Sequence, residues 1–386
     1  MVEIHGTWDE RFVGVRDALA QNFDDAGDVG ACAAVMLDGE LVVDIWGGHT
    51  DESRTQEWER DTITNVWSTT KTMTALSALV LADRGELDVD APVARYWPEF
   101  AANGKEQVLV RHLMGHTAGL PGWTEPMTDA DVCDWEKATS TLAAQAPWWE
   151  PGTASGYHAI TQGFLVGEVV RRITGQSLGT FFAKELAGPL GADFYIGLAP
   201  ADDDRVSRVI PPPELEMPPD PDSIMVRALA NPPLSAEASW TEMWRRAEIP
   251  AANGHGNARS VVAVQAALAG GGEVGGVRLL SEAGCEVVFR QQARGTDLVL
   301  GVPLCLGIGY GLNSDETPLS PNPRACFWGG WGGSIVVNDL DARLCVAYVM
   351  NKMGEGTLGD MRGANIVLST YAALAQAAAR FRRPVR

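Results

Sequence analysis

The chain has 386 residues, 46% of them hydrophobic, which suffices for a large core in one two-lobed unit or two closely packed domains. Its 50 acidic and 30 basic residues give a formal net charge of -20, which argues against nucleic acid and anionic membrane as partners. Residues 1–7 show neither the basic nor the apolar pattern of a secretory signal. The sequence contains no membrane-length apolar stretch, P-loop or Rossmann glycine set, and no C-x-x-C pair among its six cysteines. We therefore predict a soluble, cytoplasmic protein with free thiols and no cofactor.

The first half of the chain begins with strand signals and continues with helical ones. Residues 8–24 have the apolar spacing of an amphipathic helix. Residues 33–37 and 41–46 flank Asp38-Gly39, a dipeptide that strongly favours a hairpin turn. The helices expected next span residues 71–84, 106–115, 136–146, 159–174, 177–187 and 259–270. The proline-rich stretch at residues 211–221 predicts an exposed connector, with a lid as the alternative.

Strand signals return near the end of the chain, at residues 306–312, 334–338 and 344–350, before a last helix at residues 361–381. This order predicts an α+β fold, an α/β sandwich in which both chain ends form one antiparallel sheet flanked by helices. A mainly helical domain is inserted between the two ends. We place the sheet domain in residues 1–75 and 295–386 and the helical domain in residues 76–294, with the active site at their interface.

Ser68-Thr69-Thr70-Lys71 begins the helix expected at residues 71–84. Residues three apart on a helix share one face, so the Lys71 amine can reach the Ser68 hydroxyl. An adjacent amine can activate a serine as a nucleophile, and the unpaired N–H groups of a helix N-terminus suit a developing oxyanion. The alternative is a chance pair on a helix surface, because S-x-x-K is a short motif.

A second serine motif, Gly175-x-Ser177-x-Gly179, matches the G-x-S-x-G nucleophile elbow. That elbow requires a strand before the serine, whereas the segments on both sides have helical periodicity. The pattern is more typical of a helix that ends at Gly175 and a helix that is capped by Ser177. We therefore expect no catalytic role for Ser177.

Three weaker features accompany these motifs. Tyr157 lies in a glycine-framed loop, where it either packs or carries protons near a lysine. The glycine cluster at residues 329–333 precedes a strand, and such glycines mark a bulge or a close backbone approach, here of a substrate. His112 and His116 have the spacing of zinc ligands but no H-E-x-x-H glutamate and no evident third ligand, so we expect a structural role.

Ser68-x-x-Lys71, Tyr157 and Trp328-Gly329-Gly330, in this order and spacing, resemble the motifs of the penicillin-recognising serine hydrolases. Within that group the chain looks closest to the class C β-lactamase-like carboxylesterases, called family VIII esterases. Residues 113–120 are similar to the "LLSHTSGL" segment of the family, and residues 83–93 and 349–352 also fit. The resemblance covers about residues 10–375 and implies a β-lactamase/transpeptidase-like fold.

The resemblance implies a role for each motif. Ser68 would be the acylated nucleophile, and Lys71 would be either its base or the charge that keeps Tyr157 deprotonated. Tyr157 would carry the proton from Ser68 to the leaving group and later activate water. The backbone N–H groups of Ser68 and Trp331 would form the oxyanion hole. The residues that would contact the substrate are Trp328, Gly329, Gly330 and His158.

The chain departs from the class C β-lactamases at two motifs that hold the lactam. Those enzymes carry Tyr-x-Asn and Lys-Thr-Gly, where this chain has Tyr157-His158-Ala159 and Trp328-Gly329-Gly330. Tryptophan supplies no cation for a carboxylate, and its bulk favours an apolar, uncharged acyl group. His158 either reaches the substrate or stabilises its loop, and we favour the structural role. Five tryptophans are candidates to line an apolar cleft: Trp123, Trp148, Trp149, Trp240 and Trp244.

We therefore predict a serine carboxylesterase that hydrolyses esters of small to medium acyl groups through an acyl-enzyme on Ser68, without metal or cofactor. The first alternative is an acyltransferase on the same scaffold, which passes the acyl group to an alcohol or amine. Weak β-lactamase or amidase activity and a catalytically silent binding protein are further alternatives. The expected partner is a small-molecule ester, and a homo-oligomer remains open.

Overall fold

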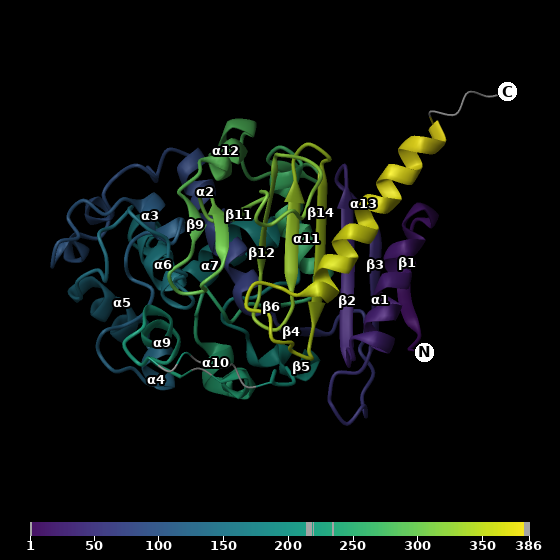
Figure 1. The fold of residues 1–386 in the computed structure, drawn as a ribbon, viewed down its shortest axis with the longest axis horizontal. Coiled ribbons are helices and arrows are strands. Elements are labelled where there is room, and N and C mark those ends of the chain that lie inside the picture. Colours follow the sequence, from purple (N-terminus) through teal and green to yellow (C-terminus); the bar gives the residue numbers. More distant parts are fainter. Residues whose placement is uncertain (1, 214–217, 219, 234, 382–386) are drawn as a thin grey trace.

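The computed structural model describes residues 2–213, 218, 220–233 and 235–381, with side chains up to residue 377. Its centre is a nine-stranded sheet in the order β1-β3-β2-β14-β13-β12-β11-β10-β9 (Figure 1), and every neighbouring pair is antiparallel. Both chain ends contribute strands that meet where β2 pairs with β14, as the sequence predicted. The strands are β1 (Ile4–Trp8), β2 (Gly30–Leu37), β3 (Glu40–Gly48), β9 (Ala293–Thr296), β10 (Pro303–Leu306), β11 (Gly311–Leu312), β12 (Ala325–Gly329), β13 (Ile335–Asp339) and β14 (Leu344–Met350).

Local turn chemistry decides where strands begin and end. Asp38 and Gly39 both have positive φ, 51° and 81°, and form the predicted hairpin turn between β2 and β3. The single strand expected at residues 306–312 is wrong, because a turn separates β10 from β11. Gly309 has φ 84°, and a Cβ on Gly307 would lie 2.1 Å from the carbonyl oxygen of Val288. Strands β1, β9 and β12 of this sheet were not anticipated.

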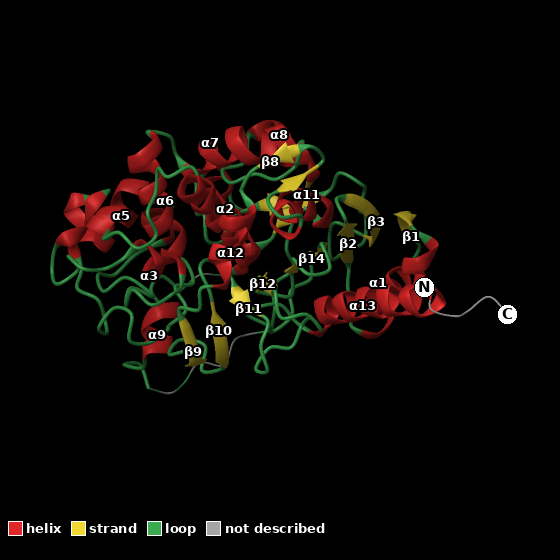
Figure 2. Ribbon diagram, turned by 90° about the horizontal axis from the view of Figure 1, so that it is seen from above, coloured by secondary structure: helices red, strands yellow, loops and turns green. Residues whose placement is uncertain are grey.

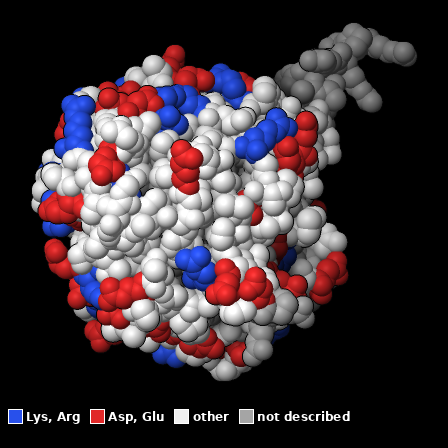
Figure 3. All heavy atoms as spheres, turned by 60° about the vertical axis from the view of Figure 1, so that its left-hand side comes forward, with Lys and Arg blue, Asp and Glu red and all other residues white. Residues whose placement is uncertain are grey.

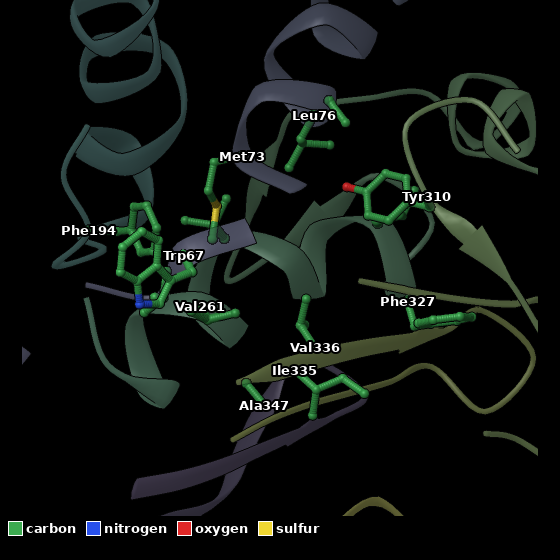
Figure 4. Packing of buried hydrophobic residues seen from close by; sticks show 14 of the residues in the cluster. Trp67, Met73, Leu76, Phe194, Val261, Tyr310, Phe327, Ile335, Val336 and Ala347 are labelled. Carbon is green, nitrogen blue, oxygen red and sulfur yellow. The ribbon is translucent and has the colours of Figure 1, made fainter. Parts of the chain in front are cut away.

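Helices cover both faces of the sheet (Figure 2). α1 (Val13–Asp25) and α13 (Met361–Phe381) lie together on one face, and α11 (Ala258–Ala269) lies on the other. Neighbouring side chains of strand β13 point to opposite faces of the sheet (Figure 4). Val336 points toward the face covered by α11, and Ile335 points to the other face. Ile335 packs under α13, where a Cβ on Gly363 would lie 2.6 Å from its Cγ2.

The remaining helices gather beside the sheet (Figure 1). They are α2 (Thr70–Asp83), α3 (Val110–Met114), α4 (Asp129–Val132), α5 (Trp135–Ala144), α6 (Thr161–Thr174), α7 (Leu178–Phe182), α8 (Gly188–Leu190), α9 (Ile224–Leu229), α10 (Glu242–Arg246) and α12 (Glu282–Glu286). α2 is central and almost entirely buried, because it contacts α6, α7, α11 and α12. α3 starts later than the expected residue 106, because residues 108–110 hydrogen-bond in an extended form with residues 91–93.

Two smaller sheets complete the fold. β4 (Ile63–Asn65) lies between β5 (Val206–Ser207) and β6 (His255–Gly256) and leads the chain to Ser68, while β7 (Glu273–Val274) pairs with β8 (Val277–Arg278). Acidic and basic side chains are interspersed on the face shown in Figure 3. All six cysteines are free thiols, and Cys133 is the least buried of them. Across the described ranges, no helix combines the length and the apolarity needed to cross a membrane.

Two predictions about the organisation of the chain are not tested by the structure. The division into a sheet domain and a helical domain at residues 75 and 295 is one of them. The other is the role of the proline-rich stretch at residues 211–221 as a connector, because residues 214–217 and 219 lie outside the described residues.

Candidate active site

The chain reaches the site through β4 and a sharp turn before α2. Trp67 has a left-handed backbone with φ 50°, a conformation that is strained for a bulky residue. Its ring packs 5.0 Å from the ring of Trp331 and 5.6 Å from that of Trp244. Its carbonyl oxygen accepts a hydrogen bond from Thr70 Oγ1 at 2.5 Å. These contacts hold Ser68 in the 3-10 turn directly before α2.

Lys71 follows one turn later and is buried, with 1% of its surface exposed. Its Nζ lies 2.9 Å from Ser68 Oγ, and it donates to the carbonyl oxygens of Ala159 at 2.6 Å and Ala251 at 3.0 Å. Burial lowers the pKa of Lys71 well below its usual value. A neutral amine has two N–H donors and one lone pair. When the two donors bind the carbonyl oxygens, the lone pair faces Ser68 Oγ and can take its proton.

Tyr157 reaches the serine from a distant part of the chain, the loop before α6. Its Oη donates to Ser68 Oγ at 2.5 Å, and its ring centroid lies 4.8 Å from Lys71 Nζ. Burial raises the pKa of Tyr157 above its usual value, so the phenol keeps its proton at neutral pH. The structure therefore brings Ser68, Lys71 and Tyr157 together around one oxygen atom.

His158 supports the loop that carries Tyr157. Its Nδ1 donates to the carbonyl oxygen of Gly156 at 2.6 Å, and its Nε2 accepts from the N–H of Leu120 at 3.1 Å. Burial lowers the pKa of His158 to about 4, which keeps the ring neutral. Both ring nitrogens thus bind backbone groups, which supports the structural role favoured for His158, and a substrate contact stays a prediction.

Trp328 lies behind Tyr157, with 1% of its surface exposed and its ring centroid 5.8 Å from that of Tyr157. Its other neighbour is His116, on which it stacks with centroids 5.1 Å apart and planes at 13°. His116 Nδ1 in turn accepts a hydrogen bond from the N–H of His158 at 3.1 Å. Trp328 supports Tyr157 and is absent from the cavity wall formed by the described residues. The direct substrate contact expected for Trp328 stays a prediction.

Gly329 and Gly330 lie where the chain packs very closely on itself. A Cβ on Gly329 would lie 2.2 Å from the backbone of Leu358. A Cβ on Gly330 would lie 2.4 Å from the carbonyl oxygen of Val66. Neither glycine contributes to the cavity wall among the described residues. Both glycines thus permit close packing of the chain on itself, and their substrate contact stays a prediction.

Two backbone N–H groups stay open beside the Ser68 hydroxyl. Ser68 lies in the first turn of a helix, where N–H groups have no helical acceptor. Trp331 follows Gly330, whose added Cβ would lie 3.4 Å from Ser68 N, so the two segments run close together. Within the described part of the chain, neither N–H donates a hydrogen bond. Both can therefore donate to a substrate oxygen.

A cavity of about 120 Å³ is bordered by Ser68 and Tyr157. The other residues of its wall, none of them charged among the described residues, are Trp67, Pro121, Trp123, Ala159, Ile160, Ala228, Leu229, Asn231, Pro232, Ala252, Leu300, Trp331 and Thr357. The amide of Asn231 is occupied by the protein, because its Oδ1 accepts from Met127 N and its Nδ2 donates to the Trp123 and Glu125 carbonyl oxygens. The cavity therefore suits an apolar, uncharged group.

The five tryptophans that were expected to line an apolar cleft lie in different surroundings. Trp123 borders the cavity, whereas Trp148 and Trp149 do not belong to the wall that the described residues form. The indole N–H groups of Trp240 and Trp244 donate to Val209 O at 2.9 Å and to Asn65 Oδ1 at 3.0 Å, so these two rings serve packing. Sequence alone showed which residues are aromatic but not which way their rings point.

Ser177 caps α7, as expected from its helical surroundings. Its Oγ accepts from the N–H of Thr180 and donates to Glu248 Oε1 at 2.6 Å, and Gly175 ends α6 with φ 70°. The helix α6, rather than a strand, precedes it, which confirms that the motif is no nucleophile elbow. Among the described residues, no group of three or more His, Cys, Asp or Glu side chains is placed to hold a metal ion.

Sequence reasoning missed the groups that hold the three central residues in place. The carbonyl oxygens of Ala159 and Ala251 fix Lys71, but backbone carbonyls leave no signal in residue type. Asp297 binds the N–H of Tyr157 at 2.9 Å although the two residues are 140 positions apart. Its place in an ordinary Asp-Leu-Val sequence gave no hint of that contact.

The antiparallel sheet, its helical layers and the Ser68–Lys71–Tyr157 cluster define a protein of the β-lactamase/transpeptidase-like class. The chain belongs to the beta-lactamase family, whose model matches residues 16–370.

Relatives agree with this assignment. The chain is 35% identical over 367 residues to Esterase/beta-lactamase LipL of Mycobacterium tuberculosis, over 91% of this chain and 83% of that protein. A solved family VIII carboxylesterase is 44% identical with a TM-score of 0.91, over 96% of this chain and 100% of the other. A penicillin-binding protein homologue from Caulobacter crescentus is 37% identical with a TM-score of 0.89, over 96% and 100%. The resemblance to family VIII inferred from three short motifs is thereby confirmed.

Proposed function

We propose that the protein is a serine carboxylesterase that hydrolyses esters of small, uncharged acyl groups through an acyl-enzyme on Ser68. One observation carries the proposal: Lys71 Nζ at 2.9 Å and Tyr157 Oη at 2.5 Å converge on Ser68 Oγ at the wall of a cavity. Similarity to a family VIII carboxylesterase and to an esterase/beta-lactamase supports an ester as the bond that is cleaved.

Lys71 acts as the general base. Its neutral Nζ takes the proton of the Ser68 hydroxyl as Oγ attacks the acyl carbon of the ester. The N–H groups of Ser68 and Trp331 donate to the carbonyl oxygen while it becomes an oxyanion, and one such donor typically contributes about 10²–10³ in rate. Burial lowers the pKa of Lys71 and thereby favours the neutral amine that this step requires.

Tyr157 acts as the general acid. As the bond between the acyl carbon and the alcohol oxygen breaks, Tyr157 Oη gives its proton to that oxygen, and the phenolate regains a proton from the Lys71 ammonium. Water then attacks the acyl carbon and gives up one proton along the same route, and Ser68 Oγ leaves as a hydroxyl. The products are an alcohol and a carboxylic acid, and the enzyme returns to neutral lysine and protonated tyrosine.

The cavity defines the substrate class. For comparison, an apolar protein cavity of about 150 Å³ binds benzene, so about 120 Å³ accepts an acyl chain of a few carbons. A substrate carboxylate would lose its hydration in a wall whose described residues offer no cation, and a buried unpaired charge is costly. The site therefore favours simple esters over carboxylate-bearing lactams.

A p-nitrophenyl ester series from acetate to octanoate tests this function with wild type, Ser68→Ala and Ser177→Ala. We expect Ser68→Ala to lower kcat by about 10⁴-fold or more, as removal of a nucleophile does in other serine hydrolases. Ser177→Ala should stay near wild type, since Ser177 only caps α7. Turnover should be fastest for the shorter chains. Activity that survives in Ser68→Ala but is lost in Ser177→Ala would overturn the proposal.

A further inference from the structure

Asp297 is a buried carboxylate outside the three central residues, with 1% of its surface exposed. It lies in the turn between β9 and β10. Its Oδ1 accepts the N–H of Tyr157 at 2.9 Å and the N–H groups of Val299 and Leu300 at 3.0 Å each. Among the described residues its Oδ2 is buried without a hydrogen-bond partner. A carboxylate left half-satisfied in the interior is costly, so a function is expected to maintain it.

The three N–H groups belong to two parts of the site. Tyr157 supplies the phenol that touches Ser68 Oγ, and Leu300 belongs to the wall of the cavity. A second bond ties the same two segments together, because the N–H of Leu298 donates to the carbonyl oxygen of Ser155 at 2.9 Å. One oxygen atom of Asp297 therefore joins the backbone of Tyr157 to that of Leu300, and both residues border the cavity.

The packing around Tyr157 makes the hydrogen bond from its N–H to Asp297 important. Tyr157 lies outside the main hydrophobic core, in a separate cluster of six buried residues. The cluster combines the β9–β10 hairpin, α9 and β12, which are far apart in sequence: its other members are Ala228, Val299, Leu304, Leu306 and Trp328. Such a small cluster fixes a side chain less firmly than a large core does, so a buried hydrogen bond to the backbone of Tyr157 adds needed rigidity.

The charge of Asp297 acts in the same direction. Burial chiefly raises the pKa of Tyr157, contacts with Ser68 and Trp328 lower it, and the Asp297 carboxylate adds a smaller raising effect. The other titratable groups that face the phenol are Lys71, with Nζ 4.8 Å from the ring centroid, and His116, whose ring centroid lies 5.3 Å away. Burial lowers the pKa of both groups, which favours their neutral forms. The Asp297 charge, bound to the backbone of Tyr157, therefore favours the protonated phenol.

We propose that Asp297 is a positioning residue that holds Tyr157 in place as the proton donor to the leaving alcohol and fixes Leu300 in the acyl cavity. The proposal rests on the function proposed above. It differs from a purely structural role in one measurable respect. A residue that positions the general acid matters most when the leaving group needs a proton, whereas a residue that only stabilises the fold affects all esters equally.

Two esters of the same acid make that distinction, ethyl butyrate and p-nitrophenyl butyrate. Both give the same acyl-enzyme, so their kcat/KM values differ only in the acylation step. An ethoxide must be protonated as it leaves, but p-nitrophenolate leaves readily without a proton. Tyr157→Phe serves as the reference variant, because it removes the proton itself and keeps the ring.

We expect Asp297→Ala to lower kcat/KM for ethyl butyrate by about 10²-fold, the effect of misplacing a catalytic group by about 1 Å. The loss for p-nitrophenyl butyrate should be about ten times smaller, and Tyr157→Phe should show the same pattern more strongly. Asp297→Asn keeps an oxygen that can accept the three N–H groups but loses the charge. It should therefore show a smaller selective loss, and it carries the test if Asp297→Ala does not fold.

Asp339 provides a matched control at the end of β13, away from the cavity wall. It is fully buried, and it accepts hydrogen bonds from Ala342 N, Ser320 Oγ, Asn322 Nδ2 and Tyr371 Oη. Asp339→Ala and Asp339→Asn should lower both kcat/KM values by the same factor. An equal loss for the two esters in both Asp297 variants would overturn the inference. Ser68→Ala tests the proposed function separately, because it must abolish turnover of both esters whatever Asp297 does.

Discussion

The two halves of the active site differ in how the chain builds them. Ser68 and Lys71 lie one turn apart at the start of α2, flanked by Trp67 and Met73 of the main core. Tyr157 belongs to a small separate cluster to which the β9–β10 hairpin, α9 and β12 each contribute. The first half is specified by local spacing on one helix. The second exists only after distant segments have packed.

This difference predicts how substitutions in each half affect the reacting groups and their positions. In the Ser68–Lys71 half, a substitution removes a reacting group but leaves its rigid surroundings in place. In the Tyr157 half, a substitution outside the reacting groups can still displace the phenol. The reason is that several segments, distant in sequence, together hold Tyr157 in position. Substitutions in the two halves should therefore give different ratios of lost activity to lost stability.

Lys71→Met tests the first half and should have the largest effect. Methionine has a similar length and is apolar, so the buried position is filled without the desolvation that lowers the pKa of the lysine. We expect kcat for p-nitrophenyl butyrate to fall by about 10²–10⁴-fold, the usual contribution of a general base. Circular dichroism should show an intact fold. A variant within about ten-fold of wild type would show that Tyr157 takes the serine proton instead.

Gly330→Ala tests the close packing between the segment after β12 and the turn before Ser68. The new Cβ would lie 2.3 Å from Ser334 Oγ and 2.4 Å from the carbonyl oxygen of Val66, so β12 and the turn before Ser68 must move apart. We expect kcat to fall by about 10²-fold through misplacement of the Ser68 and Trp331 N–H groups. Gly14→Ala on α1 is the control, because nothing lies within 4 Å of its Cβ position. Equal kinetics for the two variants would argue against the close packing.

His158→Asn tests the second half through stability and should have the smallest effect. Burial lowers the pKa of His158 from 6.5 to about 4. Between these pH values the unfolded chain binds a proton that the folded protein does not. The stability from this group is therefore complete above pH 6.5 and falls as the pH decreases toward 4, by up to about 1.4 kcal/mol per pH unit.

The measurement is the free energy of unfolding in urea at several pH values in that window. His158→Asn should give a shallower pH dependence than wild type, because it removes one of the buried imidazoles. His5→Asn on the exposed strand β1 serves as the control and should keep the wild-type slope. A slope that His158→Asn leaves unchanged would mean that the buried ring is already protonated in the folded protein.

The same contrast explains how much of the molecule could be predicted from its sequence. The β2–β3 hairpin, the bounds of α13 and the contact between Ser68 and Lys71 depend on spacing within a few residues, and all were predictable. The turn between β10 and β11 was missed, because it depends on the close approach of Gly307 to Val288, a contact that no local pattern encodes.

Within the site, order along the chain identified Tyr157 but not what holds it. Trp328 was expected to contact the substrate because its Trp-Gly-Gly motif resembles that of the family, and its ring packs against the rings of His116 and Tyr157. Asp297 carries no motif at all. Its importance arises from a bond across 140 positions of sequence, and only the folded chain brings the two residues together.

The pairing of β2 with β14 has a consequence for how the protein is made. The N–H of Gly30 at the start of β2 donates to Asn351 Oδ1 at a separation of 321 residues. During synthesis, the edge of β2 that pairs with β14 therefore has no partner until residues 344–350 have been made. An unpaired strand edge is prone to wrong pairing. The serine and lysine are translated early, but Gly330, which packs against the serine's turn, arrives late. Unfinished chains thus carry the reactive motif without its active site.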